Sequence, residues 1–360
     1  MTLQAIGTET GTWSSNPLMT VSSDVKPLMG STTSPELIFK NTTPLSQMLL
    51  DTKIDKSVFN QQSFNSTDMH VTAGFSTQNA HWVASMQERT DYDTTRTSEV
   101  TNYGLRPVVL RHLGLSLTPQ VTFNPTAVDS FALTGSAATS QYESAVFTNY
   151  RTFSATTSYT RRFDPRNAGI ISLQAQRYQT GRTNAVEINS MGPNIGWQTT
   201  FSPRLTANAS VGAQTSRQYD FGNPTSPWTW QYVFAGGFSF KGVQDTIDLK
   251  TERAQFAYGN GTEALQTSFS FAESHALNSS ISLNGGANYL SSVYQATTRG
   301  ALKNMIGGNA GASYHATECL DFTTSYRYRH EALTNTTKTA QDHAVTVGLA
   351  YRPNMWTLLQ

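Results

Sequence analysis

The segment FSATTSYTRRFDPRNAGIISLQAQRY, residues 153–178, decides the fold of this chain. From Phe153 onward apolar and polar side chains alternate, so an extended backbone would have one apolar face and one face of Ser and Thr. Asp164-Pro165 followed by Asn167 supplies turn chemistry, and the same alternation then resumes. The pattern predicts two antiparallel strands joined by a tight turn.

The polar face of this hairpin consists mostly of small neutral side chains, whereas a sheet face in bulk water usually carries Lys and Glu. We interpret the apolar face as lipid-facing and the Ser, Thr and Gln face as the lining of an aqueous interior, as in a transmembrane β-barrel. Charged residues make up only 14% of the 360 residues, yet the mean hydropathy is negative. An alternating barrel combines these properties because half of its strand positions face lipid and half face water.

Tight joins recur roughly every 40 residues, which is the spacing of two strands, one tight turn and one longer loop. They lie at 42–44, 77–79, 123–130, 163–169, 201–204, 241–245, 274–279 and 315–321. We therefore expect an all-β, antiparallel, up-and-down transmembrane barrel of about 18 strands. Residues 1–46 are expected to form its first hairpin, or else a periplasmic arm or plug, which would reduce the count to about 16. The barrel would span 47–352, and 353–360 would be a short interfacial tail without a strand.

Aromatic residues gather where the expected strands reach the membrane boundary, which favours placement of their amphipathic rings at the headgroup level. This set comprises Tyr159, Phe163, Trp197, Phe201, Trp228, Trp230, Phe238, Phe240, Tyr326, Tyr328 and Tyr351. The alternative is that they are ordinary packing residues of a soluble β-sandwich.

Charged residues on the polar faces are the candidates for lining the lumen. They are Asp51, Lys53, Asp55, Arg89, Asp91, Asp248, Lys250, Glu252, Arg327 and Arg329. Mixed charge along a wide pore would offer hydroxyl-rich solutes many hydrogen-bond partners without strong ion selection. An equally good interpretation is that the charges pair across neighbouring strands and stiffen the wall.

No pattern points to an enzyme, a cofactor or a metal site. The seven histidines have no recognisable partner spacing, no HxxH, HExxH or CxxC occurs, and Cys319 stands alone in an expected turn. The net charge of +1 leaves no basic stripe for nucleic acid. No apolar run of about 18 residues predicts a membrane-spanning helix.

Several phrases resemble a known group of proteins: SSNPLM at 14–19, SPELIFKNTTPLSQ at 34–47, the turns FDPR and FSPR, and TECLDFTTSYRYRHE at 317–331. They are similar to outer-membrane β-barrel proteins found with bacterial exopolysaccharide and exosortase (PEP-CTERM) systems. The resemblance implies a pore that exports surface polysaccharide, and no catalytic residues follow from it.

Taken together, these patterns predict a channel in the bacterial outer membrane, surrounded by outer-membrane lipid, with both termini in the periplasm. No expected external segment exceeds roughly 20 residues, so no loop is expected to fold into the lumen, and this favours conduction of a polymer. We expect an exported polysaccharide as cargo, delivered by a periplasmic export partner. The alternatives are a general diffusion or nutrient porin for small solutes, and a closed structural or adhesive barrel that uses exposed aromatics such as Trp228 and Tyr232.

Overall fold

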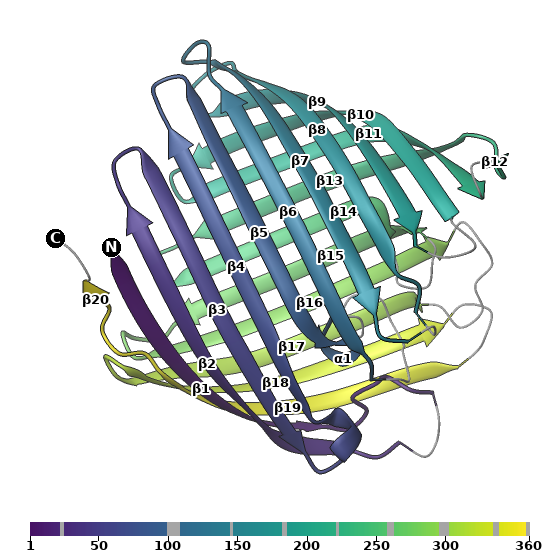
Figure 1. Ribbon diagram of the computed structural model, residues 1–360. Helices are drawn as coiled ribbons and strands as arrows, with labels where there is room; N and C mark the ends of the chain where they lie inside the picture. Colours follow the sequence, from purple (N-terminus) through teal and green to yellow (C-terminus); the bar gives the residue numbers. More distant parts are fainter. Residues whose placement is uncertain are drawn as a thin grey trace.

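The computed structural model of the chain is a closed barrel of antiparallel strands (Figure 1). Eighteen strands form the wall, and they are 13 to 17 residues long. Each wall strand pairs with its sequence neighbours, and β19 pairs with β1 to close the ring. The structure describes residues 1–21, 25–98, 109–144, 147–181, 186–220, 223–257, 263–294, 302–333 and 338–357.

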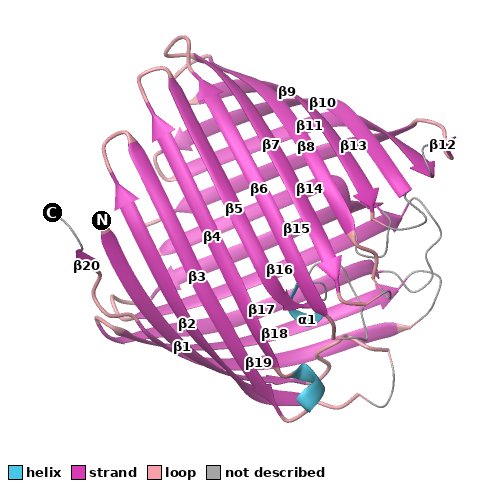
Figure 2. Cartoon of the chain, viewed as in Figure 1, coloured by secondary structure: helices cyan, strands magenta, loops and turns pink. Residues whose placement is uncertain are grey.

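The wall strands are β1 (Thr2–Ser14), β2 (Leu28–Thr42), β3 (Ser46–Phe59), β4 (Ser66–Gln78), β5 (Trp82–Thr94), β6 (Arg111–Phe123), β7 (Asp129–Tyr142), β8 (Tyr150–Arg162), β9 (Asn167–Thr180), β10 (Val186–Ser202), β11 (Leu205–Asp220), β13 (Thr229–Lys241), β14 (Asp245–Ala257), β15 (Glu263–Ala276), β16 (Ile281–Tyr294), β17 (Leu302–Thr317), β18 (Leu320–Leu333) and β19 (Thr339–Tyr351). Two-residue strands β12 (Asn223–Pro224) and β20 (Trp356–Thr357), the 3-10 turn η1 (Gln62–Phe64) and the short helix α1 (Thr95–Ser98) complete the fold (Figure 2).

All eight predicted tight joins are the short connections at one end of the barrel, which we call the tight-turn end. Side chains close these turns: Asp164 accepts hydrogen bonds from the backbone N–H groups of Arg166 and Asn167 at 2.7 and 2.9 Å. The longer connections lie at the opposite end, which we call the long-loop end. Both chain termini lie at the tight-turn end (Figure 1).

The strand faces alternate as the sequence predicts. In β9 the side chains of Ile171 and Leu173 point outward and are 59% and 52% exposed, while Ser172 and Gln174 point inward. Because a strand of about 10 tilted residues can cross a hydrocarbon core, every wall strand is long enough to do so. Among the described residues, no helix has the length and apolar character needed to cross a membrane.

The N-terminal segment belongs to the wall. β1 pairs along its whole length with β2 and also with β19, so residues 1–46 contribute a hairpin to the ring of 18. The C-terminal tail differs from expectation, because Trp356 and Thr357 form β20 and pair with Leu3 and Thr2. Residues 358–360 lie outside the described part.

At the long-loop end, the described residues 15–21 and α1 pack toward the barrel interior, whereas the sequence predicted that no loop folds into the lumen. Met19 adopts a left-handed φ of 52°, which is costly for a side chain other than Gly. It is fully buried against Ala340 of β19, and this packing offsets the strain. The guanidinium of Arg96 in α1 lies 5.0 Å from the ring of Phe59, two strands away on β3.

Apolar side chains hold these connections in the mouth of the barrel. The cluster contains Leu18, Leu28, Phe59, Phe64 and Val109. Leu28 and Phe59 have inward parity on β2 and β3, so the cluster occupies space inside the ring. The sequence did not reveal this because each member lies in a different connection or strand.

Candidate functional site: the barrel interior

A charged network crosses β3, β4 and β5 on the inner wall. The imidazole of His70 bridges two carboxylates, with Nδ1 2.7 Å from Asp91 and Nε2 3.5 Å from Asp55. Lys53 Nζ lies 2.9 Å from Asp55, and Arg89 Nε lies 2.7 Å from Asp91. Lys53, Asp55, Arg89 and Asp91 are sequence candidates that meet here: each cation pairs with a carboxylate two residues along its own strand, and His70 joins the two pairs across β4.

His70 was missed as a site residue, although its parity on β4 matches the inward charges of β3 and β5. The register pairs it with Lys53 on one side and Asp91 on the other. The tight turn at 77–79 fixes the register of β4 against β5, and this register together with the parity would have placed His70 beside Asp91. Asp51 also has inward parity, two residues from Lys53.

The charges of β14 form a separate group. Asp248, Lys250 and Glu252 have inward parity because their neighbours Ile247 and Leu249 pair with the outward Phe240 and Phe238. β14 stands nine strands from β4 in either direction round the ring of 18, so this group faces the His70 network across the lumen. Within the described part of the chain none of the three forms an ion pair, which leaves them available to water and solutes.

Arg327 and Arg329 point inward from β18 toward the long-loop end. Their guanidinium groups lie 3.5 and 3.0 Å from the fully buried carboxylate of Asp342 on β19. That carboxylate also accepts hydrogen bonds from Ser14 Oγ at 2.7 Å and from the backbone N–H of Asn16 at 3.0 Å. Asp342 therefore ties the arginines to the end of β1 and to the connection that follows it. It was missed because the sequence placed it in a loop.

Further ion pairs line the mouth. Arg111 Nη1 lies 2.8 Å from Asp68, and His112 Nδ1 lies 3.0 Å from Asp93. Both carboxylates are buried. Together with Asp342, they show that polar groups at the long-loop end serve largely to hold the mouth in one conformation.

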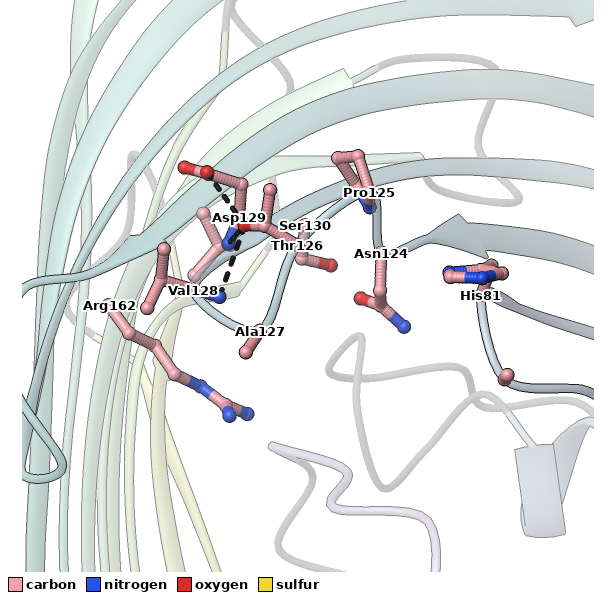
Figure 3. Close-up of a pocket in the computed structure, with 11 residues that line it drawn as sticks. His81, Asn124, Pro125, Thr126, Ala127, Val128, Asp129, Ser130 and Arg162 are labelled. Atoms are coloured by element: carbon pink, nitrogen blue, oxygen red, sulfur yellow. Dashed lines mark hydrogen bonds between the residues drawn. The ribbon is translucent and has the colours of Figure 1, made fainter.

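A hollow of about 620 Å³ lies at the rim of the tight-turn end (Figure 3). The 124–128 turn forms one side, and His81 and Arg162 come from neighbouring connections and strands. Thr126 Oγ1 donates to Asp129 at 2.8 Å and accepts from the Asp129 backbone N–H at 2.9 Å. The hollow is open and its lining mixes polar and apolar side chains, so it is not an enclosed ligand site.

The predicted interfacial aromatics lie in connections or have outward parity. Phe163 and Trp197 stack with ring centroids 5.3 Å apart near the tight-turn end, whereas Trp228 and Trp230 lie at the long-loop end. Tyr326 and Tyr328 lie between these levels on β18. Their contact with lipid headgroups stays a prediction.

Four histidines have an aspartate partner that the sequence did not reveal: His70, His112, His275 and His315. These are cross-strand pairs on adjacent strands. Among the described residues, no imidazole hydrogen bond reaches a Ser or Thr hydroxyl, which a hydroxyl nucleophile would need. No group of three or more His, Cys, Asp or Glu in the described ranges could hold a metal ion.

Comparison with known proteins places the chain by fold. No protein-family model matches it, and no curated protein matches it in sequence. A BenF-like porin from Pseudomonas fluorescens Pf-5 is similar with a TM-score of 0.53 and 12% identity, covering 98% of this chain and 99% of that chain. The outer membrane protein opdK from Pseudomonas aeruginosa has a TM-score of 0.51 with 10% identity, over 98% and 99%. The outer membrane channel DcaP of Acinetobacter baumannii has a TM-score of 0.50 with 10% identity, over 98% and 95%. The chain has the fold of outer-membrane porins.

Proposed function

We propose that this protein is a passive channel for small hydrophilic solutes in the bacterial outer membrane. The long-loop end would face the outside, and the tight-turn end with both termini would face the periplasm. The observation that carries this proposal is the pair of charged groups on opposite inner walls, the His70 network and the unpaired Asp248, Lys250 and Glu252. A solute in transit meets both signs of charge, which favours hydration over strong ion selection.

The narrowed mouth favours small solutes over a polymer. The first external connection and α1 occupy part of the interior through the cluster around Leu28 and Phe59. A flexible polysaccharide would have to pass this constriction along its whole length. The structural similarity to outer-membrane porins and channels also supports a channel.

Polysaccharide export rests on the sequence resemblance at 14–19, 34–47 and 317–331. Flux of neutral sugars of increasing length into liposomes separates the possibilities. A small-solute channel passes mono- and disaccharides and excludes long oligosaccharides, whereas an export pore admits the long ones. A closed structural or adhesive barrel admits none.

Ion selectivity provides the residue-level test. In planar bilayers, Lys250→Glu should shift the reversal potential toward cations, because it replaces the only cation of an unpaired inward group. Lys56→Glu, the same substitution on the outward face of β3 near the long-loop end, is the matched control and should leave selectivity unchanged. Equal selectivity of Lys250→Glu and the unmodified protein would contradict the lumen assignment.

A further inference from the structure

Three arginines gather on the outward face of the barrel at its long-loop end. Arg151 on β8 shares the parity of the outward Phe153, Arg177 on β9 that of Ile171, and Arg217 on β11 that of Val211. We call Arg151, Arg177 and Arg217 the rim arginines. Each lies within the last four residues of its strand at the long-loop end, above the apolar part of the outer face.

The strand register brings the rim arginines close together. Arg177 pairs with Asn189, and Asn189 pairs with Arg217, so the two arginines stand two strands, or about 10 Å, apart. Arg151 is the diagonal neighbour of Arg177, because Phe153 is the direct partner of Arg177. Three cations therefore occupy a small area of four adjacent strands.

One carboxylate partly balances them. Glu187 lies 2.7 Å from Arg177 and also accepts hydrogen bonds from Gln179 and Asn189. Arg151 forms no hydrogen bond or ion pair with any described residue. The cluster therefore has an excess positive charge, and two of its guanidinium groups are available to an anion.

Contacts with neighbouring groups fix the orientation of the Arg217 guanidinium group. Its guanidinium lies 5.4 Å from the ring of Tyr219 and 5.9 Å from the ring of Trp228, and Nε donates to the backbone oxygen of Ser226 at 3.2 Å. Its terminal nitrogens have no partner among the described residues. Aromatic stacking and one backbone hydrogen bond thus orient the two terminal donors, the arrangement that suits bidentate binding of phosphate.

We propose that the rim arginines bind the phosphorylated headgroup of an outer-leaflet glycolipid. The guanidinium groups take the phosphates, the rings of Tyr219 and Trp228 pack against the sugar, and the acyl chains lie on the outward face below. That face is apolar, since Ile195 and Val211 are 65% and 62% exposed there. This inference rests on the orientation in the proposed function, with the long-loop end outside.

The test measures, by native mass spectrometry, how well the refolded full-length protein retains each of three disaccharide lipids. The lipids have the same acyl chains and carry two phosphates, one phosphate or none. The unmodified protein should retain the bisphosphorylated lipid about tenfold or more better than the dephosphorylated one. The triple variant Arg151→Gln, Arg177→Gln, Arg217→Gln should lose this preference. Lys56→Gln, which removes an outward cation from β3, is the matched control and should keep it.

Equal retention of all three lipids by the unmodified protein, or an unchanged preference in the triple variant, would overturn the proposal. Calorimetry with inorganic phosphate separates the two anion sources. Binding of free phosphate as tight as that of the lipid would mean a soluble-anion site and would also overturn it.

Heat-modifiable gel mobility verifies that each variant is folded. Because the rim arginines point outward, the triple variant should retain full conductance. If the unmodified protein did not conduct, the channel proposal would be refuted and the lipid result would stand.

Discussion

Glu88 places a carboxylate at the middle of the outer face of the barrel, where the fold predicts contact with lipid. It is the central residue of β5, with six residues on each side, and its side chain is exposed. Six residues of a tilted strand span about 15 Å along the barrel axis, which is near the bilayer midplane. Its direct cross-strand neighbours are Ala73 and Leu117, and no described residue forms a hydrogen bond or ion pair with its carboxylate.

Replacing this carboxylate should stabilise the barrel. A charged side chain at the midplane costs about 2–4 kcal/mol for Arg or Lys and less for Glu, so Glu88→Leu should raise the free energy of unfolding by about 1–3 kcal/mol. The assay is reversible urea unfolding in phospholipid vesicles, followed by tryptophan fluorescence. The reciprocal variant Leu117→Glu, on the neighbouring strand, should lower the free energy of unfolding by a similar amount.

An unchanged or lower free energy of unfolding in Glu88→Leu, together with no loss in Leu117→Glu, would refute the assignment of this face to lipid. That result would mean that water or another protein surface covers β5 and β6. The two variants change the same face in opposite directions, so an artefact of folding efficiency cannot imitate the predicted pair of results.

Two further predictions concern single residues. His70→Ala should leave Asp55 and Asp91 without their shared imidazole, so the reversal potential in a salt gradient should shift toward cation selectivity; a shift toward anions would contradict the bridging geometry. Asp164 lies in a tight turn, where a hydrogen bond from the Asn167 side chain lowers its pKa. Because a lowered folded-state pKa stabilises the fold above the unfolded-state pKa, Asp164→Ala should reduce stability at neutral pH, and the difference should vanish as the pH falls through that lowered pKa; a difference that persists in acid would argue against an ionised Asp164.

The sequence predicted those parts of the fold that depend on local chemistry. The turn at Asp164 and Asn167 forms from side chains within four positions, and the alternation at Ile171 to Gln174 needs only the period of a strand. Signals of this kind recur along the chain, so a barrel of about 18 strands could be predicted, and the ring of 18 is confirmed.

The interior was less predictable because it depends on contacts between distant segments. Ser14 donates to Asp342 across 328 positions, and Met19 packs against Ala340 in a backbone conformation that no local motif signals. The inward connections consequently went unpredicted, and with them the narrowed mouth. The parity of Asp248 to Glu252 follows from local alternation, whereas their lack of partners appears only once the ring has closed.

The central claim is that water wets one face of each strand and lipid the other, and site-directed spin labelling tests it most directly. Single cysteines at Ile171, Ser172, Leu173 and Gln174, in a Cys319→Ser background, would carry nitroxide labels in lipid vesicles. We predict that oxygen relaxes the labels at Ile171 and Leu173 and that a water-soluble nickel complex relaxes those at Ser172 and Gln174. Loss of this two-residue alternation, or its reversal, would contradict the account.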